Sequence, residues 1–182
     1  SIHHALVVAA DYAAYLTGTP LPQLETIYPT NEGTSSFLRA GPYQLHVALK
    51  GPAVGDLTAH AWDVVQHEYG HYVQGLAGFV DTPGILPHAF DTNLTTFGDG
   101  LSKDDAVRLA WSEAWPTFFA LTAQAVEGAG ALGIPNVGDS RYQAPYAGVD
   151  VDLETRTGKG EDDELSIGAF LWDLFDGQQG GD

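Results

Sequence analysis

Residues 61–74 constrain this chain more than any other segment, because they combine a helical pattern with three metal-site residues. His67, Glu68 and His71 form the pattern H-E-x-x-H, and apolar residues surround them at helical spacing. Side chains four residues apart lie one above the other on one face of a helix, about 6 Å apart along its axis. The two histidines can therefore direct imidazole nitrogens toward one point, which predicts half of a zinc site.

The residues of this motif suit a catalytic zinc ion. Zinc binds neutral imidazole at about 2.0–2.1 Å and keeps one position for water when it is catalytic. Glu68 directly follows the first histidine, so its carboxylate can accept a proton from that water. The alternative is a helix that carries two histidines and a glutamate on a solvated face, without any metal.

Two other polar residues near the motif are poorer candidates for the metal. His60 precedes His67 by two turns, about 10.5 Å along the axis, so it cannot share the ion. Asp63 lies one turn before His67 and is too far from His71 to complete a chelate. We expect Asp63 to lie on the helix surface or to contact a ligand residue.

The length and composition are those of one globular domain. The chain has 182 residues, of which 44% are hydrophobic, and this is enough for one substantial core. We therefore expect a single domain over residues 1–182. The chain begins at Ser1 and contains no methionine, so we expect it to be a processed or excised piece of a longer polypeptide.

The charge and the lack of cysteine exclude several classes of function. The net charge of −17 argues against nucleic acid or an anionic membrane surface as a partner. No apolar run is long enough to cross a bilayer. Without cysteine, the chain cannot use thiol catalysis, and histidine, aspartate and glutamate remain as metal ligands. An acidic chain of this kind suits an extracellular or salt-rich setting, and we expect a secreted or extracellular protein.

The remaining segments predict a helix and a small sheet. Residues 1–16 have helical spacing of apolar residues. Short apolar runs separated by turn residues predict strands at 24–28, 35–39 and 43–49.

The boundaries of the motif helix and of two loops are also predicted. Asp56 can cap the helix by accepting hydrogen bonds from the free amides of its first turn, and Gly75 and Gly78 should end it. The segments 79–100 and 127–160 are rich in glycine and polar residues, so we expect both to be irregular. A long loop after a zinc helix is well placed to form a wall of the cleft.

A second helix should begin after Ser102 and carry Glu113 among aromatic residues. Glu113 is the only acid between Asp105 and Glu127. Burying an unpaired carboxylate costs several kcal/mol, and a zinc ion is one way to avoid that cost. The alternative is that Glu113 points to water from the polar side of its helix.

These two helices together resemble a known enzyme family. The motif at 67–71, followed by the sequence WSEAWPTFF at 111–119, is similar to the gluzincin, or thermolysin-like, branch of zinc metallopeptidases. In that branch a glutamate on the helix after the motif helix is the third zinc ligand, and the motif glutamate is the general base. The resemblance therefore implies Glu68 as the base and three zinc ligands: His67, His71 and Glu113.

The resemblance also implies a fold and an activity. Residues 1–182 would form a single metallopeptidase-like catalytic domain with an α+β, zincin-like fold. A small antiparallel sheet would pack on the motif helix, with further helices below the cleft, and residues 166–176 would form a closing helix like that of similar secreted proteins. The activity would be that of a zinc-dependent endopeptidase acting on a peptide or protein outside the cell. Two alternatives stay open: a non-catalytic zincin-like binding module, and a zinc hydrolase for a non-peptide ester or amide.

The chain departs from the family pattern around Glu113. Family members often have an asparagine before this glutamate and an aspartate four residues after it to orient a histidine, whereas this chain has Ser112 and Thr117. We expect the missing carboxylate to be supplied from elsewhere, with Asp173 as the candidate. Pro116 removes a helical hydrogen bond, so we expect it to bend or restart the second helix.

Two further groups of residues are candidates for supporting roles. An oxyanion beside zinc is usually stabilised by a donor such as tyrosine or histidine, and the candidates are His88, Tyr142 and Tyr146. Calcium could bind a set of acidic residues near the C-terminus, although a solvated acidic surface explains them better. These acids are Asp150, Asp152, Glu154 and residues 161–164.

Overall fold

The computed structural model describes residues 1–30, 36–38, 43–48, 61–79, 81–84, 86 and 88–177. The described residues form helices and two small sheets, which confirms an α+β composition. The helices are α1 (Ile2–Thr17), α2 (Trp62–Ala77), α3 (Lys103–Val126) and α4 (Glu164–Asp176), with 3-10 turns at Ala129–Leu132 and Pro145–Ala147. The strands are β1 (Glu25–Thr30), β2 (Ser36–Leu38), β3 (Gln44–Ala48), β4 (Arg141–Ala144) and β5 (Val149–Asp152).

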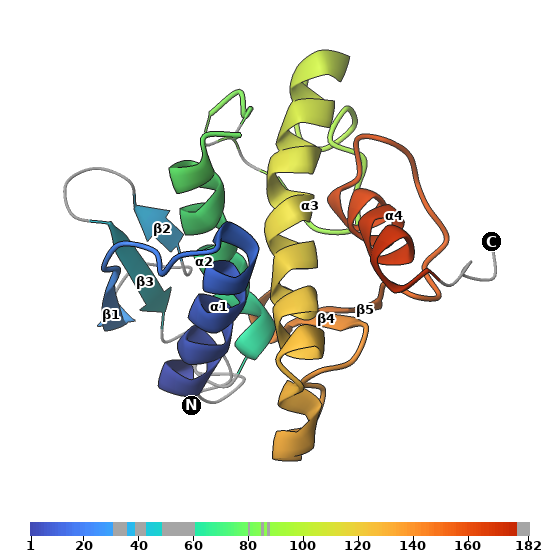
Figure 1. Ribbon diagram of the computed structural model, residues 1–182. Coiled ribbons are helices and arrows are strands. Elements are labelled where there is room, and N and C mark those ends of the chain that lie inside the picture. The colour runs from blue at the N-terminus through green and yellow to red at the C-terminus, as the bar shows by residue number, and fades with distance from the viewer. Residues whose placement is uncertain are drawn as a thin grey trace.

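The long helix α3 stands at the centre of the molecule (Figure 1). Helices α1 and α2 pack against it on one side and α4 on the other. The three-stranded sheet lies beyond α1 and α2. Among the described residues, no helix is both long enough and apolar enough to cross a membrane.

The N-terminal sheet is mixed, which corrects the expectation of an antiparallel sheet. Its strand order is β1-β3-β2. Strand β2 pairs antiparallel with β3, with Phe37 opposite Leu45, whereas β1 pairs parallel with β3, with Thr26 opposite Leu45. Parallel neighbours need a connection that returns the chain to its starting direction. Here β2 lies within that connection, so two strands that are not consecutive become parallel neighbours.

The sheet packs on α2, as predicted. Leu45 and Val47 on β3 are fully buried and belong to one hydrophobic core with α1, α2 and α3. Burying a side chain of this size contributes about 1.5–3 kcal/mol, so these contacts fix the sheet against the motif helix. The core residues contributed by α2 are Trp62, Val65, Tyr69, Tyr72 and Val73.

Helix α3 continues through Pro116, which corrects the expected restart of the helix at this residue. The helix begins after Ser102, whose hydroxyl accepts a hydrogen bond from the amide of Asp105 at 3.2 Å, and runs unbroken to Val126. Pro116 lies against Gly70 of α2, so closely that a β-carbon on Gly70 would be 2.8 Å from the Pro116 Cα. This close approach of the two backbones packs Pro116 firmly within the helix pair.

Three other boundary predictions have different outcomes. Helix α2 continues through Gly75 and ends at Gly78, whose φ of 74° favours glycine. Asp56, which is the predicted cap of this helix, lies outside the described residues, and so does His60. The segment 127–160 is less irregular than predicted, because it contains the antiparallel pair β4 and β5.

Asp63 belongs to a buried polar network and not to the helix surface, which corrects one of its two expected placements. It is 3% exposed. Its carboxylate accepts hydrogen bonds of 2.7 Å from the side-chain amide of Gln124 and of 2.7 Å from the backbone amide of Gln143. Gln124 also donates to Gln66, which donates to the carbonyl of Ala5. The network therefore joins α1, α2, α3 and β4 behind the motif.

Asp63 should make the stability of the protein depend on pH. Burial raises the pKa of Asp63 from 3.8 to about 7, although the hydrogen bonds from Gln124 and Gln143 act in the opposite direction. Between these values the folded protein binds more protons than the unfolded chain. The free energy of unfolding should therefore fall as pH rises from about 4 to about 7, by at most about 1.4 kcal/mol per pH unit from this group.

Urea unfolding across this pH range would measure the effect. Replacing Asp63 with asparagine removes the titrating group, so the Asp63→Asn variant should lose this part of the slope. The free energy of unfolding of the wild type minus that of the variant should therefore decrease as pH rises from about 4 to about 7. A difference that stays constant with pH would contradict the prediction.

Candidate metal centre

Helices α2 and α3 bring three potential ligands of a metal ion together. The Nε2 atom of His67 lies 3.3 Å from Oε2 of Glu113, and the Nε2 atom of His71 lies 3.2 Å from the same oxygen. The two rings are 4.8 Å apart between centroids and nearly perpendicular. The site therefore combines two nitrogens from one helix with one oxygen from its neighbour, as the sequence predicts.

The spacing of these atoms fits a tetrahedral zinc ion. Ligands at about 2.0–2.1 Å from zinc in tetrahedral geometry are about 3.3 Å from one another. The measured nitrogen–oxygen separations of 3.3 and 3.2 Å agree with this value. Two imidazoles and one carboxylate form a donor set found in catalytic zinc sites, where a fourth position is left for water. The three residues can therefore hold a metal ion with little rearrangement.

The far side of each imidazole ring is fixed by a hydrogen bond. Nδ1 of His67 is 3.0 Å from the hydroxyl of Thr117, and Nδ1 of His71 is 3.2 Å from the side-chain oxygen of Gln74. When Nε2 binds a metal, Nδ1 carries the proton and donates it to these oxygens. Thr117 thus takes the position that we had predicted for Asp173, because its hydroxyl is one turn after Glu113 and faces His67.

The three residues shift one another's pKa values strongly. Burial lowers the pKa of His67 to about 4, although its hydrogen bond to Glu113 acts in the opposite direction. Burial also lowers the pKa of His71, but the charge and hydrogen bond of Glu113 outweigh this and raise the pKa to about 9. Burial raises the pKa of Glu113, and His71 and His67 together hold it well below its usual range. Glu113 is thus an ionised carboxylate that faces the two rings, and not a residue that points to water.

Glu68 is buried next to the candidate ligands. It is 9% exposed, and its charge is one of the causes that raise the pKa of His71. The carboxylate therefore lies within electrostatic reach of the centre, on the same helix as both histidines. Its role as a general base stays a prediction.

His88 reaches the centre from the loop between α2 and α3. Its Nε2 atom lies 3.7 Å from Oε2 of Glu113, and its side chain is 29% exposed. Its Nδ1 atom lies 3.1 Å from the carbonyl of Leu86, which can only accept a hydrogen bond. Nδ1 therefore carries the proton, and Nε2 presents its lone pair to the centre when the ring is neutral.

The two tyrosine candidates lie in the C-terminal half. The ring of Tyr142 on β4 packs beside His67, with 6.0 Å between centroids, and the residue is 1% exposed. Tyr146 lies in the 3-10 turn Pro145–Ala147, and its side chain is outside the described part of the structure. Donation of a hydrogen bond to an oxyanion stays a prediction for Tyr142, Tyr146 and His88.

Glu164 is the most unusual acid near the centre, and the sequence places it only among acids that could hold calcium or lie on a solvated surface. The structure buries Asp162, Asp163 and Glu164, with exposures of 8%, 0% and 1%, which corrects their assignment to a solvated surface. Their position directly before the apolar helix α4 was the available signal, since Asp163 caps that helix. Burial, together with the nearby charges of Glu113 and Asp163, raises the pKa of Glu164 well above its usual range.

The other acids considered for calcium do not gather into a site. Among the described residues, groups of three potential ligands form only at His67, His71 and Glu113, and at His88, Glu113 and Glu164. Asp150 pairs with Arg141, and Asp152 accepts a hydrogen bond from Ser140. These residues have local partners instead of a shared cation.

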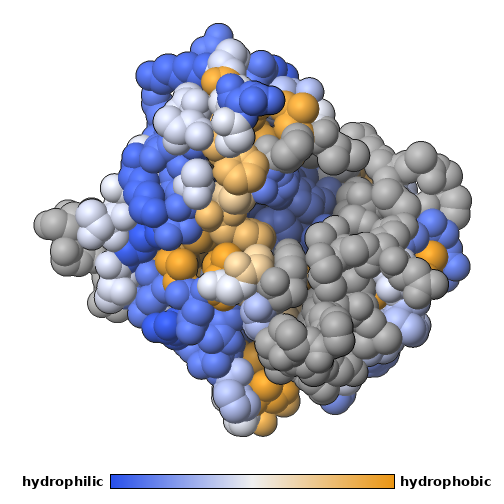
Figure 2. All heavy atoms as spheres, turned by 180° about the vertical axis from the view of Figure 1, so that it is seen from behind, coloured by the Kyte–Doolittle hydropathy of each residue, from blue (hydrophilic) through white to orange (hydrophobic). Residues whose placement is uncertain are grey.

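The centre is partly open to solvent. The side chains of His71 and Glu113 are 23% and 14% exposed, whereas that of His67 is 6% exposed. The face of the molecule shown in Figure 2 is hollowed near its middle, with hydrophilic residues inside the hollow and hydrophobic residues gathered along one side. The exposed fractions of His71 and Glu113 allow water to reach both side chains.

Comparison with known proteins identified no relative of this chain. No protein-family model, no curated protein and no solved structure matches the chain. The interpretation of the site therefore depends on its own geometry and chemistry.

Proposed function

We propose that this chain is a zinc-dependent endopeptidase with a zincin-like fold. The observation that carries the proposal is the convergence of the Nε2 atoms of His67 and His71 on one oxygen of Glu113, at 3.3 and 3.2 Å. Glu68 lies beside this centre on the same helix. This combination of three ligands and an adjacent carboxylate is suited to the hydrolysis of a carbonyl substrate.

Each residue of the centre has a defined task in this reaction. A zinc ion held by the three ligands would supply a Lewis acid that polarises the carbonyl and lowers the pKa of water. Glu68 accepts the proton of the attacking water and then delivers it to the leaving amine. Thr117 and Gln74 hold the two imidazoles in the tautomer that presents Nε2. The substrate is an extracellular peptide or protein, and the chain acts as a secreted enzyme.

Hydrolysis of a mixed peptide library tests this function directly. The purified chain with zinc should cut the library, and mass spectrometry should give its side-chain preference. Cleavage should disappear with a chelator and in the Glu68→Gln variant. Matched ester substrates run beside the peptides would identify an esterase if only the esters are cut. No cleavage of either class by the zinc-loaded chain would refute the catalytic proposal and favour a binding module.

A further inference from the structure

A second group of metal-binding atoms adjoins the first and shares Glu113 with it. His88, Glu113 and Glu164 each place one potential ligand atom within 4.8 Å of the other two. These residues come from three parts of the fold: the loop before α3, the middle of α3 and the first turn of α4. The proposed zinc site explains Glu113, but it leaves Glu164 without any task.

Glu164 is buried without a hydrogen-bond donor. It is 1% exposed, and among the described residues neither of its carboxylate oxygens has a hydrogen-bond partner. Arg156, whose charge acts on Glu164, makes its ion pairs with Asp163 and Asp91, at 2.6 Å each. Burying a carboxylate without a partner costs several kcal/mol, and such groups in proteins are usually paired or bound to a metal. The position of Glu164 beside Glu113 thus calls for a cation between them.

His88 adds a neutral nitrogen ligand to these two carboxylates. Its Nδ1–H group donates to the Leu86 carbonyl, so its Nε2 lone pair faces Glu113 across 3.7 Å. This is the arrangement of most metal-binding histidines, in which the second ring nitrogen donates to a carbonyl or carboxylate. One imidazole and two carboxylates form a ligand set that suits zinc or manganese.

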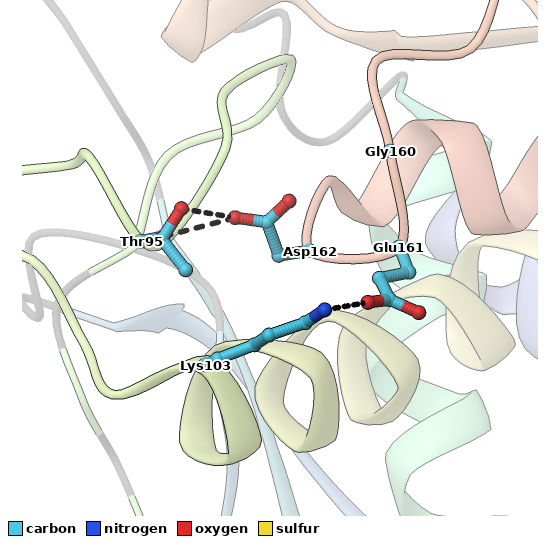
Figure 3. A pocket seen from close by; sticks show the side chains of 5 residues that line it. All are labelled: Thr95, Lys103, Gly160, Glu161 and Asp162. Carbon is cyan, nitrogen blue, oxygen red and sulfur yellow. Dashed lines mark hydrogen bonds and ion pairs between the residues drawn. The ribbon is translucent and has the colours of Figure 1, made fainter.

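Hydrogen bonds between two loops hold these ligands in place. The Asp162 carboxylate accepts from the side chain of Asn93 at 2.6 Å and from the hydroxyl of Thr95 at 2.5 Å. Figure 3 shows the contact between Asp162 and Thr95 together with the ion pair of Lys103 and Glu161. These contacts join the loop of His88 to the segment that leads into α4, so the geometry of the second group is built into the fold.

We propose that His88, Glu113 and Glu164 bind a second divalent cation, zinc or manganese, with Glu113 bridging it to the ion held by His67 and His71. The Nε2 atoms of His67, His71 and His88 all face Oε2 of Glu113, so this carboxylate lies between the two groups of ligands. Two-metal hydrolytic sites hold their ions about 3.5–4 Å apart. The inference shares Glu113 with the proposed zinc site, but it concerns metal binding and does not depend on peptidase activity.

Metal stoichiometry tests this inference without measuring catalysis. The metal-free chain is titrated with zinc, and in parallel with manganese, by calorimetry, and bound metal is counted by elemental analysis after removal of the excess. The wild type should bind two equivalents per chain. Glu164→Gln and His88→Asn should each bind one, and His71→Asn should also lose one equivalent. Glu161→Gln, an acid of the same segment with 61% of its side chain exposed, serves as the control and should keep two.

The outcomes separate this inference from the proposed function. A wild type that binds only one equivalent at saturation overturns the second site, whichever variant removes that ion. Two equivalents that persist in both Glu164→Gln and His88→Asn also overturn it. The proposed function fails on a different result, the absence of hydrolysis by the metal-loaded chain. Circular dichroism of each variant checks folding, and the two variants of the second site test it through different ligands.

Discussion

Replacing Glu68 with glutamine should lower kcat/KM for peptide hydrolysis by about 10²–10⁴-fold while zinc remains bound. The variant keeps the size of the side chain and removes its ability to accept a proton. Glu68 is not one of the three converging ligands, so His67, His71 and Glu113 should still hold the ion. Steady-state kinetics and bound zinc should be measured on the same preparation, because the prediction lies in the contrast between them.

The matched comparison is Glu113→Gln, which removes a ligand and not the base. Its zinc affinity should fall by more than the 10–100-fold that loss of a residue supporting a ligand typically causes. The two variants make the same chemical change, a carboxylate to an amide, at positions with different tasks. A Glu68→Gln enzyme with wild-type kcat/KM would show that Glu68 is not the base. Loss of zinc in Glu68→Gln would show that it helps to hold the ion.

The parts of the site that the sequence predicts are those set by local helical geometry. The four-residue spacing of His67 and His71 places both rings on one face of any helix, so their convergence needs no knowledge of the rest of the fold. Glu113 is predicted because a lone acid within an aromatic helix needs a partner. The structure brings these three residues together on α2 and α3, and α3 runs through Pro116 without the restart that the sequence predicts.

The parts that the sequence does not predict depend on contacts between distant segments. Glu164 belongs to an acidic run, and such a run is usually solvated. Its burial results from the packing of α4 on α3 and from the pairing of Asp163 with Arg156, which join residues far from the motif. The parallel pairing of β1 with β3 is also non-local. Periodicity along the chain reports burial of one face, but it does not report which neighbour covers that face.

The role of Thr117 shows a third kind of limit. A family pattern led us to look for a carboxylate beside His67, and therefore to Asp173. The structure instead places a hydroxyl 3.0 Å from Nδ1 of His67, at the position of the missing aspartate. A hydroxyl can accept the same hydrogen bond, although it carries no charge to increase the basicity of the imidazole. The sequence shows a threonine at position 117. Whether its hydroxyl can orient His67 depends on the distance between the two side chains, which only the structure gives.

The contact between Gly70 and Pro116 predicts the second large effect, a loss of both stability and zinc affinity in Gly70→Ala. A β-carbon at Gly70 would lie 2.8 Å from Cα and 2.9 Å from Cβ of Pro116. Both atoms are parts of a rigid helix, so the two helices must move apart. Overpacking of this kind costs about 1–3 kcal/mol. The movement also separates His71, the neighbour of Gly70, from Glu113, one turn before Pro116.

Gly168→Ala is the matched control, because Gly168 is also a helical glycine next to a buried surface. A β-carbon there would lie 3.6 Å from Cδ1 of Leu153, an ordinary contact. This variant should be unchanged or more stable, by up to about 1 kcal/mol, because alanine favours the helix. Thermal unfolding with and without zinc measures both variants. Gly70→Ala should melt several degrees lower than the wild type, and zinc should raise its melting temperature by less. The prediction is contradicted if the two variants have equal melting temperatures and if zinc raises both by the same amount. In that case α2 and α3 can separate without disturbing the centre. The contact between Gly70 and Pro116 would then have no role in placing Glu113.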